Sequence, residues 1–266
     1  MQLLLGIISG ILISLLAWRA GSLSNSGAVA AAVTGGLIFG LGGLPWAALL
    51  LVFFISSSAL SKTFKRRKAG LGEKFAKGSQ RDWGQVLAND GLGTLLVLIL
   101  AFAPDQTWIW AAYAGAMAAV NADTWATELG VLNPKPPRLI TNGKVVEPGT
   151  SGGISPWGTL ATLGGAALVG LVGAAFSVGG GTLTLLTAVT LGGVCGSLFD
   201  SLLGASVQAI YHCPCCNKET ERHPTHSCGT ETVQIRGWGW LSNDMVNFLA
   251  SILGAVVAGG VWWVWQ

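Results

Sequence analysis

The chain has 266 residues, of which 51% are hydrophobic and only 10% are charged, and its formal net charge is +3. Soluble globular domains carry about 25% charged residues, and so small a net charge gives no reason to expect nucleic acid as a partner. Glycine, present 39 times, is commoner in membrane helices than in soluble ones. The composition therefore predicts one integral membrane domain over residues 1–266, an all-α transmembrane bundle of about seven or eight helices with short loops.

Eight apolar stretches follow one another along the chain, and each approaches the roughly 20 residues that a membrane-spanning helix needs. They are Leu3–Trp18, Ala28–Leu44, Trp46–Leu60, Val86–Ala103, Trp108–Gly130, Trp157–Phe176, Thr182–Ile210 and Leu241–Trp265. No basic residue precedes the first stretch, so it is interpreted as a retained helix and not as a signal peptide. The second and third stretches are short, and a re-entrant pair is the alternative for them.

The basic residues occupy one side of this eight-span arrangement. The alternate connections 19–27, 62–85, 131–156 and 211–240 contain all 15 lysines and arginines, whereas the other connections and both chain ends contain none. Because Lys and Arg are concentrated in cytoplasmic loops, this side is predicted to be cytoplasmic.

Acids and amides inside the spans gather toward the same end. Asp123 and Asp200 both lie late in spans that run toward the cytoplasmic side. Two other spans begin there with polar residues, which are Asn89, Asp90, Asn243, Asp244 and Asn247. An ionisable group within the membrane is costly and marks a functional site by default, so we predict a single polar site at the cytoplasmic end.

The motif N-A-D-T-W-A-T-E-L-G, residues 121–130, contributes Asp123 and Glu128 from one helix. Residues five apart on a helix point about 140° away from each other, so the two carboxylates are expected to contact different groups. Together with Asp200 they are candidate ligands for Mg²⁺, a hard ion that binds carboxylate oxygen and nucleotide phosphates. The alternative is that they are helix-end acids that reach water or pair with an arginine in a loop.

The stretch Gly149-Thr150-Ser151-Gly152-Gly153 is the best candidate for a phosphate-binding loop. Glycine-rich turns of this kind present backbone N–H groups to anions, and a helix that begins just afterwards adds its positive end. The loop lacks the G-K-[ST] ending of a Walker motif. The alternative is a plain turn.

Residues 62–81 contain eight basic side chains between two predicted spans. Lys62, Lys77 or Arg81 is a candidate for neutralising substrate phosphates. The alternative is a topology determinant that lies against anionic lipid head groups.

Four cysteines lie between residues 213 and 228. Cys213 and Cys216 form a C-x2-C knuckle, and His226 with Cys228 would complete a tetrahedral zinc site. A cytoplasmic location disfavours disulfides, and zinc would be structural in a loop, about residues 211–239, that is too short for a core of its own. The alternatives are reduced cysteines in an ordered loop, or reactive cysteines.

Four ordered motifs carry a resemblance to one integral-membrane family, which includes plant and cyanobacterial phytyl-phosphate kinases and the animal transmembrane protein 19. The motifs are N-A-D-T-W-A-T-E-L-G, then P-R-L-I-T with G-T-S-G-G-I-S, then G-S-L-F-D-S-L-L-G-A, then N-D-M-V-N. The family is more distantly similar to the CTP-using phytol and dolichol kinases and to membrane cytidylyltransferases. The resemblance implies a CTP-dependent and Mg²⁺-dependent kinase that converts phytyl phosphate, an isoprenyl monophosphate, to phytyl diphosphate for tocopherol and prenylquinone synthesis. It also implies a plasma or thylakoid membrane location.

A CTP-dependent and Mg²⁺-dependent kinase would use each candidate residue in an expected role. Asp123 and Asp200 bind magnesium directly, with Glu128 as a ligand or an orienting group, while Arg81, Lys77 or Arg138 offsets charge on the transferred phosphate. Phosphoryl transfer needs such neutralisation and positioning more than covalent help. The remaining candidates for contacts with nucleotide or acceptor are Lys62, Asn89, Asn121, Gly149, Thr150, Ser151, Gly152, Gly153, Ser201, Gln208, Asn243 and Asn247.

Two rival functions use the same residues. A cytidylyltransferase would share the magnesium, the CTP and the lipid phosphate but attack the α-phosphate. A lipid or ion transporter would also place acids in its spans, although transport sites lie near the middle of the membrane and these acids lie toward one face.

Overall fold

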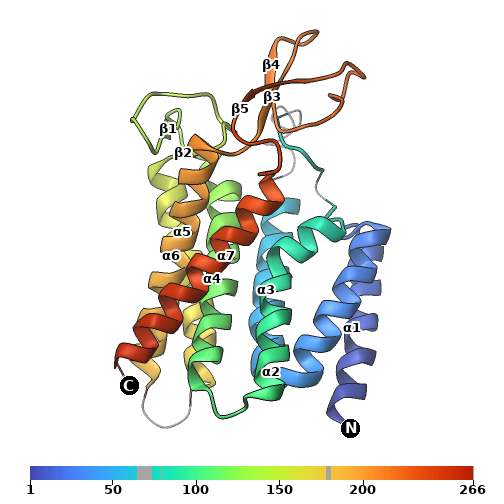
Figure 1. Ribbon diagram of the computed structural model, residues 1–266, viewed down its shortest axis with the longest axis vertical. Coiled ribbons are helices and arrows are strands. Elements are labelled where there is room, and N and C mark those ends of the chain that lie inside the picture. The colour runs from blue at the N-terminus through green and yellow to red at the C-terminus, as the bar shows by residue number, and fades with distance from the viewer. Residues whose placement is uncertain (65–73, 79, 178–180, 266) are drawn as a thin grey trace.

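The computed structural model describes residues 1–64, 74–78, 80–177 and 181–265. Within these residues the chain forms seven helices, six of which are long and apolar enough to cross a membrane by length and composition. They stand side by side in one bundle (Figure 1), as predicted for a polytopic helical membrane protein. The helices are α1 (Gln2–Arg19), α2 (Asn25–Thr63), α3 (Trp83–Phe102), α4 (Thr107–Gly130), α5 (Pro156–Ala175), α6 (Thr182–Ser206) and α7 (Asn243–Trp265).

Helix α2 contains two of the predicted spans, joined at a break. Gly43 has φ of 75° and ψ of −165°, which interrupts the helix. A straight helix from Ser24 to Ser58 would be about 50 Å long. However, the Ser24 N–H donates to the Arg81 carbonyl at 3.0 Å, and the Arg81 guanidinium donates to the Ser58 hydroxyl at 3.2 Å. Both ends of α2 therefore meet at Arg81, so the chain reverses at Gly43 and forms two antiparallel arms.

Helix α4 lies at the centre of the bundle. All of its residues from Ala111 to Ala122 are buried, and it contacts α2, α3, α5, α6 and α7. A helix that is surrounded by protein need not present an apolar surface to lipid. This explains why the most polar helix of the chain, with Asp123 and Glu128, can lie in the middle of a membrane bundle.

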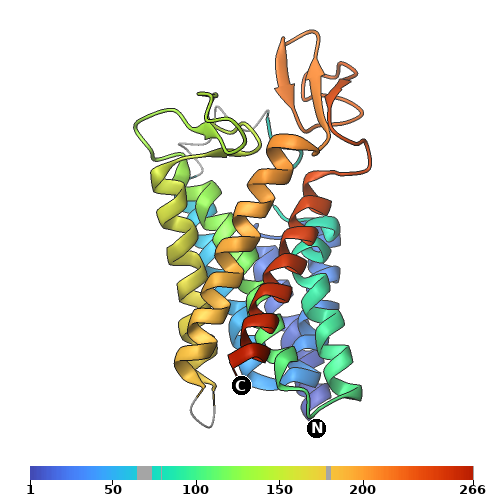
Figure 2. The same cartoon turned by 60° about the vertical axis from the view of Figure 1, so that its left-hand side comes forward.

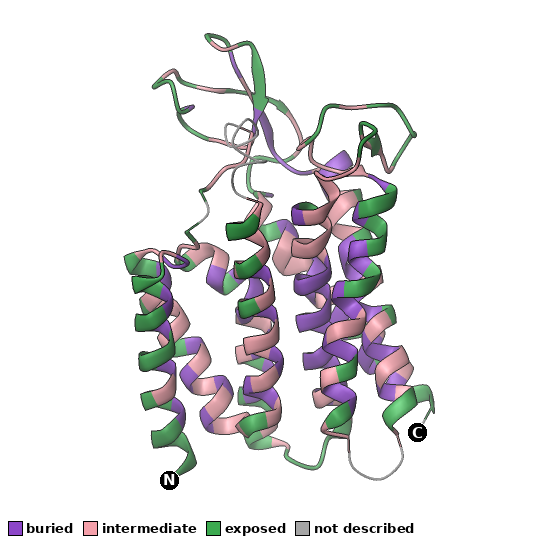
Figure 3. Ribbon diagram, turned by 180° about the vertical axis from the view of Figure 1, so that it is seen from behind, coloured by how far each residue is buried: buried purple, intermediate pink, exposed green. Residues whose placement is uncertain are grey.

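The outer helices present apolar side chains outward. On α1, Leu4, Ile8 and Leu12 are between 53% and 62% exposed, and Figure 3 shows the exposed face of this helix along its whole length. An apolar surface of this extent suits a lipid environment and not water.

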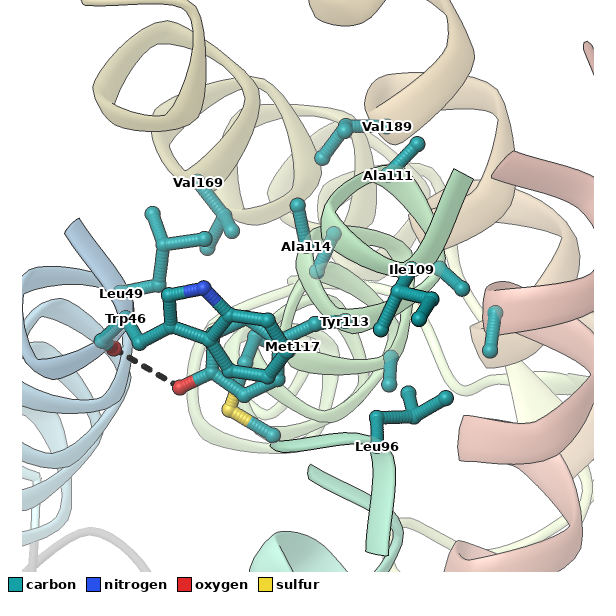
Figure 4. Packing of buried hydrophobic residues seen from close by; sticks show 14 of the residues in the cluster. Trp46, Leu49, Leu96, Ile109, Ala111, Tyr113, Ala114, Met117, Val169 and Val189 are labelled. Carbon is teal, nitrogen blue, oxygen red and sulfur yellow. Dashed lines mark hydrogen bonds between the residues drawn. The ribbon is translucent and has the colours of Figure 1, made fainter. Parts of the chain in front are cut away.

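The hydrophobic core is centred on the stacked rings of Trp46 from α2 and Tyr113 from α4 (Figure 4). Trp46 stacks on Tyr113 with ring centroids 4.1 Å apart, and the Tyr113 hydroxyl donates to the Trp46 carbonyl at 2.8 Å. Met117, Leu96 and Leu49 pack around this pair. A buried hydroxyl without a partner would cost about 1–3 kcal/mol, so the hydrogen bond lets a tyrosine occupy the core.

The two ends of the bundle differ. The chain ends lie at one end, and the small sheets lie at the other (Figures 1 and 2). At the sheet end, β1 (Arg138–Leu139) pairs antiparallel with β2 (Gly153–Ile154), and β3 (Ile210–Cys213) lies between β4 (Lys218–Thr220) and β5 (Val233–Arg236). The span predicted for 182–210 is therefore wrong at its end, because Ile210 pairs with β5 instead of continuing α6. All described Lys and Arg residues belong to segments at the sheet end (Figure 1). Residues 65–68 of the basic stretch lie outside the described residues.

Candidate functional site

The acidic centre of the site forms where α4 and α6 cross. The two helices run in the same direction toward the sheet end (Figure 2), and a Cβ added to Gly196 would lie 2.4 Å from the Cβ of Ala119. Small residues allow helix backbones to approach this closely. Asp200 and Asp123 each lie one turn beyond this contact, so the crossing brings both carboxylates to the same level.

Two adjoining cavities open on these carboxylates. The acidic cavity, of about 360 Å³, also reaches Lys77 and Arg81, and the loop cavity, of about 270 Å³, reaches the Gly149–Gly153 loop. The residues that line both cavities are Phe75, Asp123, Thr124, Thr127, Glu128, Asp200, Glu221, Asn243 and Asn247. The two cavities are therefore two compartments of one site, and four of the residues that they share are acids.

Glu221, which sequence analysis did not identify, joins Asp123, Asp200 and Glu128 as a fourth carboxylate that lines both cavities. It follows β4, and its backbone N–H donates to the Lys74 carbonyl at 2.8 Å. Its carboxylate accepts hydrogen bonds from the Ala76 N–H at 3.2 Å and from Nε2 of Gln208 at 2.8 Å. Hydropathy gave no signal for Glu221, because it lies in a polar loop between the sixth helix and the last.

Asp123, Asp200 and Glu221 lie close enough for their charges to interact, and burial raises the pKa of Glu221. In the described part of the chain no Lys or Arg forms an ion pair with any of the three, and Oδ2 of Asp200 is buried without a hydrogen-bond partner. Buried carboxylates are usually paired or bound to a metal, and a set of carboxylate oxygens suits Mg²⁺. The donor chemistry thus fits a magnesium ion.

Glu128 faces a different set of neighbours. Its residue is 4% exposed, and its carboxylate accepts a hydrogen bond from the Ser61 hydroxyl of α2 at 2.6 Å. Its charge also interacts with Arg81. Glu128 thus has Ser61 and Arg81 as neighbours, while both Asp123 and Glu128 line the two cavities; that the two carboxylates contact different groups stays a prediction.

Lys77 lines the acidic cavity, but its charge is already offset. Its ammonium group contacts Asp82 at 2.9 Å and also contacts Asp244. Although partial burial opposes it, these two carboxylates raise the pKa of Lys77. Burial likewise opposes the shift at Asp82, where the Gln85 N–H and Lys77 lower the pKa. Two carboxylates around one ammonium leave Lys77 little attraction for a phosphate.

Arg81 is the cation of the acidic cavity whose charge no ion pair among the described residues offsets. Its guanidinium lies over the rings of Phe53 and Phe54, 5.2 and 5.5 Å from their centroids. It forms no ion pair among the described residues, and it interacts with Asp90 and Glu128 only at longer range. Arginine geometry suits phosphate oxygens, so Arg81 is better placed than Lys77 to bind a substrate phosphate.

The Gly149–Gly153 loop packs against α6, and α5 begins directly after it. Gly149 and Gly152 have φ of +79° and +80°, a conformation that other residues rarely adopt. A Cβ on Gly152 would lie 2.4 Å from atoms of Ala205. The glycines are thus needed for the turn and for its contact with the end of α6.

Several donors predicted to bind phosphate are used inside the protein. The Thr150 N–H donates to the Glu147 carbonyl at 3.2 Å, and the Gly153 N–H donates to the Thr150 carbonyl at 3.0 Å. The Ser151 hydroxyl donates to Oε1 of Gln208 at 2.6 Å. These contacts match the plain-turn alternative for much of the loop, although the loop lines its cavity, and phosphate binding by it stays a prediction.

Other predicted substrate contacts line cavities. Asn89, Asn243 and Asn247 reach the acidic cavity, and Ser201 reaches the loop cavity. Lys62 lines a separate cavity of about 600 Å³, which it shares with Arg81 and Ser61.

Three predicted contacts do not line these cavities. Asn121 is fully buried and ties helices together, because its side chain accepts from the Ser56 hydroxyl at 2.9 Å and donates to the Gly165 carbonyl at 2.8 Å. Gln208 is 1% exposed and supports Glu221. Arg138 is exposed and donates to the Gly143 carbonyl at 2.9 Å.

The structure brings together the four residues predicted to bind zinc. One ligand atom from each of Cys213, Cys216, His226 and Cys228 can be chosen so that all lie within 4.8 Å of one another. Cys215, their sequence neighbour, is exposed.

Comparison with known proteins places the chain among membrane proteins. The family described as "Integral membrane protein DUF92" matches residues 8–255. The chain is 35% identical over 274 residues to "Protein PGR" of Arabidopsis thaliana, covering 95% of this chain and 93% of the relative. It is 32% identical over 259 residues to "Uncharacterized membrane protein MJ0933" of Methanocaldococcus jannaschii, covering 96% and 92%.

A more distant relative in the same plant is "Protein VTE6, chloroplastic", 25% identical over 240 residues, covering 89% of this chain and 64% of the relative. No solved structure matches the chain. These similarities confirm the membrane family that the four motifs indicated.

Proposed function

This chain belongs to the DUF92 family of integral membrane proteins, and from that premise we propose that it is a magnesium-dependent phosphotransferase. It transfers a phosphoryl group from CTP to an isoprenyl monophosphate held in the bilayer, as in the conversion of phytyl phosphate to phytyl diphosphate for tocopherol and prenylquinone synthesis. The motif resemblance to phytyl-phosphate kinases supports the substrate class. The chemistry of the site supports the reaction type.

The observation that carries this proposal is the convergence of Asp123, Asp200 and Glu221 on one cavity beside Arg81. These carboxylates would hold a magnesium ion, which supplies neutralisation of nucleotide phosphate charge. Arg81 would bind the transferred phosphoryl group and stabilise the charge that spreads over its oxygens. The acceptor is itself a phosphate oxygen that is largely ionised near neutral pH, so the reaction requires no strong general base.

The level of the site suits a reaction between a soluble donor and a lipid acceptor. Asp123 and Asp200 lie near the sheet end of their helices, where the bundle meets the loops (Figure 1). A nucleoside triphosphate cannot enter the hydrocarbon core of the membrane, and a phytyl chain does not leave it. Their phosphates can meet only near this boundary. A site at the middle of the membrane would instead suit transport.

The basic loops support a cytoplasmic orientation for this site. All described Lys and Arg residues belong to segments at the sheet end, and Lys and Arg are concentrated on the cytoplasmic side of membrane proteins. We therefore place the site toward the cytoplasm, or toward the equivalent compartment of a thylakoid, in a plasma or thylakoid membrane.

Product analysis tests the reaction. Purified protein in lipid nanodiscs is incubated with phytyl phosphate, CTP and Mg²⁺, and the nucleotide and lipid products are separated. The kinase produces CDP and phytyl diphosphate. Release of pyrophosphate with a CDP-lipid would refute the kinase in favour of cytidylyl transfer, and absence of any lipid product would refute both.

Three isosteric variants test the assignment of the acids. Asp123→Asn and Asp200→Asn should abolish turnover while the protein remains monodisperse in detergent. Asp105→Asn is the matched control, because Asp105 is an exposed acid in the loop before α4, at the opposite end of the bundle. Full activity in either of the first two variants would remove that residue from the magnesium site.

A further inference from the structure

In the tetrad of Cys213, Cys216, His226 and Cys228 the ligand atoms lie within 4.8 Å of one another, and two of their separations match those of a zinc site. The sulfurs of Cys213 and Cys228 are 3.5 Å apart, and Nδ1 of His226 is 3.4 Å from the sulfur of Cys228. Ligands about 2.0–2.3 Å from a tetrahedral zinc ion lie about 3.3–3.8 Å from one another. Nε2 of His226 is buried with no hydrogen-bond partner within the described residues, so the polar contact of this imidazole is the one that its Nδ1 makes with the Cys228 thiol.

In the sheet that carries the tetrad, Ile210 and Tyr211 of β3 are buried, but the apolar side chains of β5 are not. Val233 and Ile235 of β5 are 60% and 50% exposed, whereas Cys213 and His226 are 0% and 3% exposed. Small units without an adequate apolar core usually depend on a metal or on disulfides. In the module formed by β3, β4, β5 and their loops, residues 210–236, a cysteine and a histidine that could bind a metal are among the buried side chains.

The tetrad is connected to Glu221 through the register of one hairpin. Cys213 pairs with Lys218, and Tyr211 pairs with Thr220, and Glu221 is the next residue. Fixing Cys213 therefore fixes where β4 ends and where the Glu221 side chain leaves the sheet. From that point its carboxylate reaches both cavities.

The same module is attached to the end of α6. The Arg236 guanidinium of β5 donates to the carbonyls of Gly204 at 3.0 Å and Ala205 at 3.2 Å. Carbonyls in the last turn of a helix lack partners within the helix, and a cation is favourable there. The module is thus anchored on the helix that supplies Asp200.

We propose that Cys213, Cys216, His226 and Cys228 bind one zinc ion, and that this ion holds the module so that Glu221 serves as a third carboxylate ligand for the divalent cation of the acidic cavity. The second part rests on the proposed function, because it needs a magnesium site there. Zinc is structural in this scheme. It acts through the position of Glu221.

Zinc binding is tested by comparing neighbouring cysteines. Elemental analysis of the purified chain should give about one zinc per chain for the wild type and for Cys215→Ser, and at least a tenfold lower content for Cys216→Ser. Zinc-free wild-type protein, or Cys216→Ser with a full zinc content, would overturn the site.

The link from zinc to Glu221 is tested by amide hydrogen exchange over residues 218–223. Removing zinc from the wild type with a chelator should speed exchange in this segment at least tenfold, and restoring zinc should reverse the change. This measurement avoids a cysteine variant that fails to fold. Unchanged exchange in zinc-depleted protein would overturn the link.

Glu221 itself is tested by titration with Mn²⁺, used as a spectroscopic probe for Mg²⁺, in zinc-loaded protein. Glu221→Gln should weaken Mn²⁺ binding at least tenfold and keep its zinc. Glu219→Gln is the matched control, since Glu219 is an exposed acid on β4. Equal Mn²⁺ affinity in the Glu221→Gln and wild-type proteins would overturn the ligand role. None of these readouts needs phosphoryl transfer, so failure of the inference and failure of the proposed reaction can be told apart.

Discussion

Replacing Gly152 with alanine tests whether the glycine loop owes its place in the site to its contact with α6. The new Cβ would lie 2.4 Å from atoms of Ala205, in a residue whose φ is +80°. Left-handed backbone costs a non-glycine residue about 1–2 kcal/mol, and inserting a methyl group into a packed contact costs about 1–3 kcal/mol. The variant should therefore lose about 2–5 kcal/mol in the stability of this region.

Gly143→Ala is the matched control. Gly143 has φ of +68°, and a Cβ there meets nothing within 4 Å. This variant should lose only the backbone part, about 1–2 kcal/mol. The difference between the two variants therefore measures the contact with α6, and is about 1–3 kcal/mol.

The assay is thermal unfolding in detergent, together with amide exchange over residues 147–155. Gly152→Ala should lower the unfolding temperature more than Gly143→Ala and should speed exchange in the loop. Equal effects of the two substitutions would refute the reasoning, because they would show that the loop can leave α6 without loss of stability.

Two further predictions concern polar contacts that the structure revealed. Asn121→Leu should lower the unfolding temperature, because it removes the hydrogen bonds of the buried Asn121 side chain with the Ser56 hydroxyl and the Gly165 carbonyl, each of which contributes about 0.5–1.5 kcal/mol; unchanged stability would argue for the substrate contact predicted from the sequence. Lys77→Met should be destabilised relative to the wild type by a steady amount from pH 6 to pH 9. Partial burial opposes the shift, but Asp244 and Asp82 raise the pKa of Lys77. The wild-type advantage should therefore fade above about pH 10.4, where the ammonium group loses its proton. It should also fade in acid, where the two carboxylates become protonated. An advantage that persisted in acid would show that the ion pairs do not cause it.

The sequence by itself indicated a polytopic bundle of membrane-length helices, and the end at which its acids and its Lys and Arg residues gather. Hydropathy and the cost of burying charge are local properties, so the spans and the one-sided distribution of Lys and Arg could be read along the chain. The cost of burying charge also singled out Asp123 and Asp200, because a carboxylate within an apolar helix is costly and usually marks a functional site. The C-x2-C spacing, with His226 and Cys228 nearby, likewise identified the four side chains of the tetrad, because all four belong to one short segment.

Only the tertiary structure decided which of these groups meet, and which are already occupied. Glu221 joins the acids because a hairpin far along the chain folds back over α6, and no local pattern records that approach. Lys77 is already paired, because Asp244, remote in sequence, contacts its ammonium group. Asn121 is buried between helices instead of facing the cavity, because the Gly165 carbonyl of α5 lies against it. Partners of this kind are set by long-range packing, which depends on the shape of the whole bundle and not on any one segment.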